Sequence, residues 1–451
     1  MVSRLKSRLF DSLRSVFCLN KKSTKRTDKM ITIKEQKNAA SASTYFDEHL
    51  TRDDYYTKDD PSHGKWFGKL APEFRLSGAV EKESFDCLAS GFNPKTGTKL
   101  TERLRSDRNA YFDFTCSTPK SVSIVGLIAG DKRVVKCHQA ASVKAMEYLE
   151  RSACVRVRKG ADVLTTKRAY TGKIVAAHFD HEASRSLDCQ LHRHYCVFNV
   201  TKAADGKLMA LDTRRMYDRS KTATEVYRNE LAKGLLELGY NLRPTAKGFE
   251  IAGVSPDLLE RFSKRQQKIA GKVAEREDAL GRKLSSKERS VIVQQTRPAK
   301  VSLSTDDLLA RLEGQLTKPE KKELAALVRY ADHSRGGGMK ISEKDLVAAA
   351  LSREPKGKRV AGHEVIRRCL VMGRGSVDLD KLETALFSPR KGSTHNLEIP
   401  FRSFGRKDAR VGVSLHFRGY SPSTSKLLFR CLALAAREME RGFGKPIELF
   451  K

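Results

Sequence analysis

Four of the eleven histidines of this chain fall within seventeen residues of one another. Residues 173–181 and 191–201 have the composition of two strands, and the polar residues between them favour an antiparallel hairpin. Side chains two positions apart on a strand point to the same side, so His192 and His194 share a face. Pairing in the hairpin would bring His181 beside His192. The window therefore predicts three imidazoles around one divalent ion, with the open coordination positions of a catalytic site.

Two other interpretations of this window are weaker. A His-x-His pair on a strand is often only a polar surface pair, and the third histidine is what favours metal binding. A zinc hydrolase of the H-E-x-x-H kind does not fit, because Glu182 is followed by Ala183, Ser184 and Arg185. No carboxylate stands at a general-base position beside the histidines.

The overall charge points to a polyanionic partner. Lysine and arginine number 87 against 54 acidic residues, which gives a net charge of +33. DNA, RNA or an anionic membrane are the usual partners of a chain this basic, and the charge favours a nucleic acid. No run of about 18 apolar residues is present, so no transmembrane helix is expected. The hydrophobic fraction of 39% is enough to build cores, and the length predicts more than one domain. The nine cysteines form no C-x-x-C pair, which favours a reducing cytoplasm over a disulfide framework.

The histidine window resembles the signature of the MobF-class conjugative relaxases, H-E-x-S-R-x-x-D-P-Q-L-H-x-H. This chain agrees with it from His181 to His194, except that Cys189 stands where the family has proline and Arg193 where it often has threonine. Arg193 is expected to point away from the metal face. Other segments are similar to further blocks of the family in the same order, so that the resemblance covers residues 30–300. These segments are DFTCSTPKSVS at 113–123, the Trp66 and Leu76 region, YRNELA at 227–232 and FSKR at 262–265.

The resemblance implies an α/β fold of the HUH (His-hydrophobe-His) relaxase kind. A central antiparallel sheet in a palm-like layout would carry helices on one face and the metal on the other, and a smaller, mainly helical region would follow. Residues 111–116 read as a strand, and 39–48, 132–151 and 222–238 as helices. We expect four parts. They are a basic amphipathic extension at 1–29, the relaxase domain at 30–300, a helical, winged-helix-like domain at 301–390 and a C-terminal segment without a recognised role at 391–451.

The resemblance also assigns roles to individual residues. His181, His192 and His194 would bind the metal, and Tyr45 would make the first cut. Either Tyr55 or Tyr56 would act in a second transesterification. Asp113 shares a strand face with Tyr111 and Thr115, opposite Phe112 and Phe114, and would orient a ligating histidine or receive the phenolic proton. The residues expected to contact DNA are Lys120, Arg185, Arg261, Lys264 and Arg265.

The activity that this family resemblance implies is a metal-dependent DNA relaxase. It would nick one strand at an origin of transfer through a 5′-phosphotyrosine adduct and later rejoin it. The expected ion is Mg²⁺ or Mn²⁺, with Zn²⁺ as an alternative. Expected partners are single-stranded DNA with an origin hairpin, and a coupling protein and accessory DNA-binding proteins of a type IV secretion system. No Gly-Lys is followed by Ser or Thr, so a separate helicase is expected. The expected location is the bacterial cytoplasm, with export alongside the transferred strand.

Two alternatives stay open on the sequence alone. The fold could serve a non-catalytic, sequence-specific DNA-binding protein or repressor, although a complete set of histidines, Asp113 and Tyr45 argues for catalysis. A rolling-circle replication initiator would share the chemistry but act at another DNA site, and the order of the blocks favours the relaxase.

Overall fold

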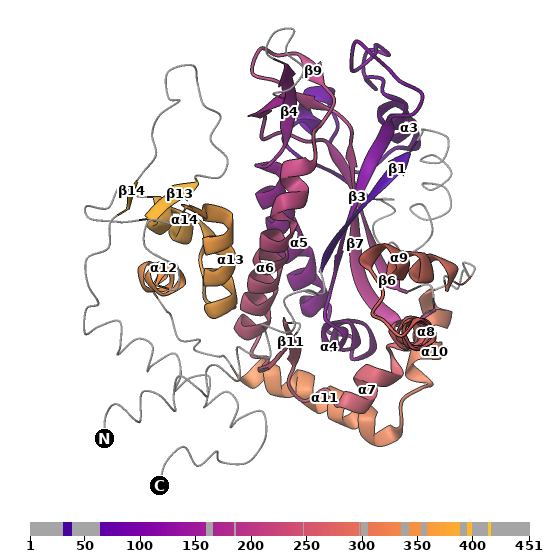
Figure 1. The fold of residues 1–451 in the computed structure, drawn as a ribbon. Coiled ribbons are helices and arrows are strands. Elements are labelled where there is room, and N and C mark those ends of the chain that lie inside the picture. Colours follow the sequence, from indigo (N-terminus) through magenta and orange to yellow (C-terminus); the bar gives the residue numbers. More distant parts are fainter. Residues whose placement is uncertain are drawn as a thin grey trace.

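A five-stranded antiparallel sheet lies at the centre of the molecule (Figure 1). Its strands, in spatial order, are β1 (Ile31–Lys37), β3 (Asn109–Ser117), β7 (Cys189–Phe198), β6 (Ala176–Ala183) and β2 (Lys65–Phe67). All neighbours pair antiparallel, and β6 and β7 form the predicted hairpin. The computed structural model describes residues 30–37, 64–158, 166–184, 186–246, 248–296, 298, 305–334, 342–352, 359–387, 395–398 and 414–415. The predicted α/β class with a central antiparallel sheet is confirmed.

Two long helices cover one face of the sheet. Phe112 and Phe114 of β3 point to this face and are buried, as their alternation predicted, in a core shared with α5 (Lys132–Glu150) and α6 (Arg214–Glu237). The helix expected over 222–238 is part of α6, which begins eight residues earlier. Its first two turns are mostly polar, and tertiary contacts hold them to the rest of the protein. One of these is Arg219, which is buried with its guanidinium over the ring of Tyr170 and bonded to its hydroxyl.

The opposite face of the sheet is divided into two parts. One part is covered by α3 (Lys82–Ser90) and the short helix η2 (Ala71–Phe74), which form a second core with the aromatic side chains of the sheet. Phe85 of α3 packs edge-on against Tyr111 and Phe198. The histidine-bearing ends of β6 and β7 extend beyond this second core. The metal face and the helix-covered face are thus opposite, as predicted.

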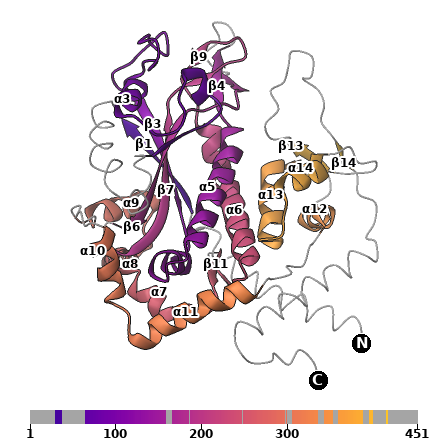
Figure 2. The ribbon, with the colours of Figure 1, turned by 180° about the vertical axis from the view of Figure 1, so that it is seen from behind.

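Helices from two parts of the sequence lie around the histidine end of the sheet. Pro119 precedes α4 (Lys120–Ser123), which continues as the π-helical turn η3 (Ile124–Ile128). The charged region after residue 255 is helical as predicted, with α7 (Pro256–Arg261), α8 (Lys264–Leu280) and α9 (Ser286–Gln295). Figures 1 and 2 both place α8 and α9 on the side of the sheet away from α5 and α6.

The region after residue 304 packs on the rest of the protein through shared hydrophobic contacts. Buried side chains of α11 to α14 belong to the same core cluster as α5 and α6. In particular, α13 lies against α6, where the Thr222 hydroxyl donates to the His363 carbonyl over 3.0 Å. The helices are α10 (Thr305–Glu313), α11 (Lys318–His333), α12 (Glu343–Leu351), α13 (Gly362–Met372) and α14 (Leu379–Phe387). The predicted domain boundaries stay a prediction.

The remaining strands form small sheets of two or three strands at the margins. They are β4 (Cys154–Arg158), β5 (Thr166–Tyr170), β8 (Thr201–Lys202), β9 (Leu208–Met209), β10 (Leu242–Thr245), β11 (Gly248–Ile251), β12 (Arg359–Ala361), β13 (His395–Glu398) and β14 (Ser414–Leu415). None of the helices that the structure describes is long and apolar enough to cross a membrane. The extension 1–29, the helix expected at 39–48 and most of 391–451 lie outside the described residues.

Candidate three-histidine metal centre and DNA-binding arm

The three predicted metal ligands meet at one end of the β6–β7 hairpin. His181 is the direct partner of His192 in the antiparallel register, and His194 lies two residues further along the same face of β7. The ring centres of the three pairs are 5.2, 5.1 and 5.1 Å apart. Strand alternation and hairpin pairing thus bring the three imidazoles together, as the spacing predicted.

Hydrogen bonds set the tautomers of two of these rings. The Nδ1 of His192 lies 2.8 Å from the carbonyl oxygen of Gln190, and the Nδ1 of His194 lies 2.8 and 3.0 Å from the two carboxylate oxygens of Asp113. Both partners are acceptors, so each Nδ1 carries a proton and each Nε2 is the nitrogen left for a metal ion. Burial lowers the pKa of His192 well below its usual range, which keeps that ring neutral. A neutral imidazole whose Nδ1–H is held by an acceptor is the form that binds a metal ion through Nε2.

Asp113 lies behind His194 at the centre of β3 and is 6% exposed. Burial raises the pKa of its carboxyl, but the charge and hydrogen bond of His194, together with Lys34 and Thr115, outweigh this and lower the pKa overall. Lys34 is the register partner of Asp113 on β1, and the Thr115 hydroxyl donates to Asp113 over 3.2 Å. Asp113 is therefore an ionised acceptor directed at His194, a contact that supports the orienting role over the proton-receiving one.

The donor chemistry of this cluster fits a divalent ion. Rings bound to one ion through nitrogens at about 2.1 Å have centres about 5 Å apart, close to the separations found here. The rings of His181 and His192 are stacked, with their planes 22° apart. No group of three or more histidine, cysteine or acidic side chains in the described part of the chain has a ready-formed metal geometry. Rotation of the rings is needed to face all three toward one ion.

Lys120, expected to contact DNA, has hydrogen-bond partners within the protein. Its ammonium donates to the carbonyl of Cys189 over 2.8 Å and to the side-chain oxygen of Gln190 over 2.9 Å. Burial lowers its pKa. The side-chain amide of Gln190 in turn donates to the Thr118 carbonyl. These contacts fasten the start of β7 to the start of α4. Arg185 lies outside the described residues.

The other three cations predicted to bind DNA lie where α7 and α8 join the rest of the protein. Arg261 pairs with Glu320 at 2.9 Å, and the Lys264 ammonium donates to the side chain of Gln315. The backbone N–H of Arg265 donates over 3.2 Å to the carboxylate of Asp188, in the turn between the histidine strands. Asp188 therefore caps the first turn of α8 from outside, since the N-cap residue of that helix makes no side-chain cap bond.

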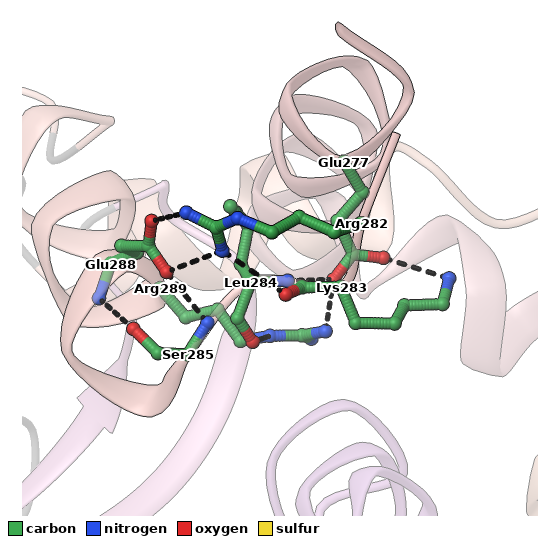
Figure 3. Close-up of polar contacts among 7 residues, drawn as sticks. All are labelled: Glu277, Arg282, Lys283, Leu284, Ser285, Glu288 and Arg289. Atoms are coloured by element: carbon green, nitrogen blue, oxygen red, sulfur yellow. Dashed lines mark hydrogen bonds and ion pairs between the residues drawn. The ribbon is translucent and has the colours of Figure 1, made fainter. Parts of the chain in front are cut away.

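Helices α8 and α9 form a hairpin whose tip is held by its own ion pairs (Figure 3). Glu277 accepts from Lys283, from the backbone of Leu284 and from Arg289. A capping box of Ser285 and Glu288 starts α9, and Arg282 pairs with Glu288. Other cations of this hairpin are exposed and make no ion pair with another described residue. These are Lys268, Arg276 and Lys287. We call α8 and α9 the basic arm.

The sequence reasoning missed an ion pair behind the histidines. Arg193 forms two hydrogen bonds with Asp180, each 2.6 Å long. The two residues are register partners on β6 and β7 and lie on the face opposite the histidine rings. Arg193 does point away from the metal face, as expected. The signal that could have found its partner was the opposite charge at the paired position of the predicted hairpin.

The candidate nucleophiles Tyr45, Tyr55 and Tyr56 lie outside the described residues. The described residues that flank them are Lys37, at the end of β1, and Gly64, just before β2. These two strands are the opposite edges of the five-stranded sheet.

Comparison with known proteins identifies the family. Residues 39–318, more than half of the chain, match the family model described as TrwC relaxase. The multifunctional conjugation protein TraI of Escherichia coli is 31% identical over 285 residues, which cover 60% of this chain and 15% of TraI. TraI of Escherichia coli strain K12 is likewise 31% identical over 284 residues. The matched part is thus a small fraction of the length of these relatives.

Solved structures of TrwC resemble the fold. The metal-bound conjugative relaxase TrwC in complex with oriT DNA is 30% identical, with a TM-score of 0.56, and the match covers 65% of this chain and 98% of that one. A copper-bound complex of TrwC with oriT DNA is 32% identical, with the same TM-score and coverage. The relationship to MobF-class relaxases that the motifs predicted is confirmed, and the chain belongs to the TrwC relaxase family.

Proposed function

We propose that this protein is a conjugative DNA relaxase that nicks one DNA strand at an origin of transfer and later rejoins it. The observation that carries the proposal is the cluster of His181, His192 and His194, in which two of the three rings have their Nδ1 protons engaged by Gln190 and Asp113. Such a cluster has no evident use in a protein that only binds DNA. Membership of the TrwC relaxase family supports the same reaction.

The nucleophile that we propose is the phenol of Tyr45. Its oxygen would attack the scissile phosphorus, a new P–O bond would form, and the bond to the 3′-oxygen would break. The products would be a 5′-phosphotyrosine and a free 3′-hydroxyl. Reversal by that hydroxyl, or a second attack by Tyr55 or Tyr56, would release the strand. Because each step exchanges one phosphodiester for another, no ATP is needed.

Other residues would hold the reacting groups in place. A divalent ion bound by the three histidines would supply positive charge to the scissile phosphate. Asp113 would fix the ring of His194, because both of its oxygens lie within hydrogen-bond distance of that Nδ1. For the ion itself we propose Mg²⁺ or Mn²⁺, with Zn²⁺ as the alternative that imidazole ligands favour.

The proposed partners follow from the proposed reaction. The substrate would be single-stranded DNA bearing an origin-of-transfer hairpin. A coupling protein and accessory DNA-binding proteins of a type IV secretion system would receive the covalent complex, and a separate helicase would unwind the duplex. The protein would act in the bacterial cytoplasm and leave the cell with the transferred strand.

A test of this proposal is the formation of an SDS-stable protein–DNA adduct. Single-stranded oligonucleotides tiled across the DNA flanking the gene are incubated with Mg²⁺ or Mn²⁺, or with EDTA. We expect a metal-dependent adduct on one tile, lost in Tyr45→Phe and kept in Tyr330→Phe. Tyr330 is a suitable control because it is 57% exposed on α11.

The outcomes separate the alternatives. Tight binding to one tile with no adduct would favour a non-catalytic DNA-binding protein. An adduct that maps to an origin of replication would favour a rolling-circle initiator. An adduct that survives in Tyr45→Phe but disappears in Tyr55→Phe or Tyr56→Phe would move the first cut to the second tyrosine cluster.

A further inference from the structure

An ion pair lies between the metal-face histidines but on the opposite side of the same two strands. Asp180 and Arg193 are register partners, and the pairs on either side of them are His181 with His192 and Phe179 with His194. The guanidinium of Arg193 binds the carboxylate through two atoms, at 2.6 Å each. Its side chain is only 6% exposed. Such a two-point pair fixes the relative position of two strands better than a single contact does.

Helix α5 holds the same pair from the other side. The side-chain amide of Gln139 donates to Asp180 over 3.2 Å, and Arg193 donates to the hydroxyl of Ser142 over 3.3 Å. Ser142 also lies 3.0 Å from the hydroxyl of Tyr195. The ion pair therefore ties β6, β7 and α5 together directly behind the histidine cluster.

The pairing of β6 with β7 becomes irregular next to His181. The regular pairing ends there, because the register shifts between His181 and Ala183. A slip of one residue along β6 would turn His181 to the helix-covered face, since side chains alternate between the two faces of a strand. The pair of Asp180 and Arg193 is an ionic link between the two strands one residue before His181.

We propose that Asp180 and Arg193 are a positioning pair that keeps His181 in register with His192 and His194. This inference rests on the proposed role of the three histidines in binding a divalent ion. A competing role is general stability, since any pair this deeply packed also affects folding. The competing role can be tested because the chain contains another buried pair far from the histidines. There Arg374 binds Glu225 of α6 at 2.8 Å, and Arg228 binds the other oxygen of Glu225 at 2.6 Å.

The experiment compares Arg193→Met with Arg374→Met in the full chain. Each variant removes a guanidinium from a packed ion pair, so both are expected to melt at a lower temperature. Glu225 keeps Arg228 as a partner in Arg374→Met, and Asp180 keeps the amide of Gln139 in Arg193→Met. Co²⁺ is titrated into each protein, and its visible absorption reports the ligands and their geometry. We expect Arg193→Met to bind Co²⁺ at least tenfold more weakly with an altered spectrum. Arg374→Met should keep the wild-type affinity and spectrum, and Arg193→Lys should fall between Arg193→Met and wild type.

Two results would overturn the positioning role. One is a Co²⁺ affinity and spectrum in Arg193→Met that match wild type. The other is an equal loss of affinity in Arg374→Met, which would mean that Co²⁺ affinity follows general stability.

A wild-type protein that binds no Co²⁺ would count against the proposed metal centre itself. The positioning role is then decided without metal, by NMR of ¹⁵N-labelled histidine. Shifts of the His181 and His192 rings that change in Arg193→Met but not in Arg374→Met would support it. Unchanged shifts would refute it.

Discussion

Asp113 contacts the ring of His194 with both carboxylate oxygens, at 2.8 and 3.0 Å from Nδ1. Replacement by asparagine keeps the shape but offers an N–H₂ group that can turn toward the ring and reverse its tautomer. We expect Asp113→Asn to weaken Mn²⁺ binding about 10- to 100-fold. Isothermal titration calorimetry measures the effect. Thr115→Val is the matched control, because it removes only a hydroxyl that contacts Asp113 and His194.

If Asp113→Asn bound Mn²⁺ as tightly as Thr115→Val and the wild-type protein do, the orienting role of Asp113 would be wrong. Loss of the adduct at unchanged Mn²⁺ affinity would instead favour the proton-receiving role for this carboxylate.

The parts of the fold and site that depend on short-range periodicity could be predicted from the sequence. Alternation along β3 predicted that Phe112 and Phe114 point into the core and that Asp113 points to the other face. The same rule predicted that His192 and His194 share one face of their strand. What could not be predicted are contacts between distant residues that have no periodic signature. The hydrogen bond from Lys120 to the carbonyl of Cys189, 69 residues away, is one such contact.

The cations expected to bind DNA show the same limit. A run of lysine and arginine indicates a basic surface but does not say which members are used within the protein. The charged groups of Arg261, Lys264 and Arg265 all have intramolecular partners, because acceptors on α11, on the loop before it and on α9 lie beside them. Only tertiary structure separates these residues from the exposed cations of the basic arm.

The exposed cations of the basic arm should account for more of the salt dependence of DNA binding than Lys120 does. Each phosphate contact on single-stranded DNA contributes about −0.7 to the slope of log K against log salt. If all three contact phosphate, the combined replacement of Lys268, Arg276 and Lys287 by glutamine should make the slope shallower by about 2. Lys120→Met should lower the melting temperature and leave the slope unchanged. Fluorescence anisotropy at several salt concentrations measures the slope for each protein. Equal slopes in the wild-type protein and both variants would mean that these cations of the basic arm do not contact DNA.

Asp188 should set the stability of the first turn of α8. It is buried and accepts from the backbone N–H of Arg265. Asp188→Ala removes this cap, which costs about 1 kcal/mol for caps of this kind. We expect faster amide hydrogen exchange at the start of α8, by about fivefold, with little change in α5. Asp188→Asn keeps an acceptor oxygen and should retain most of the protection. Exchange that is unchanged in Asp188→Ala would show that the helix start is held by other contacts.

His138 should make the folded protein sensitive to mild acid. It is buried on α5, its Nδ1 lies 2.8 Å from the hydroxyl of Tyr227, and burial lowers its pKa to about 3. Below about pH 6.5 the unfolded chain binds a proton on this side chain that the folded chain does not. The free energy of unfolding therefore falls as the pH decreases from about 6.5 toward 3, by about 2 kcal/mol at pH 5 from this group.

The matched variant is His138→Asn, which can keep a hydrogen bond to Tyr227 but does not titrate. Urea unfolding at pH 7 and pH 5 should show that the wild-type protein loses about 2 kcal/mol more than the variant between the two conditions. His178, whose pKa burial also lowers to about 3, contributes equally to both proteins and cancels in this comparison. Parallel losses in the two proteins would mean that His138 is protonated in the folded state, and that its environment is more polar than its burial implies.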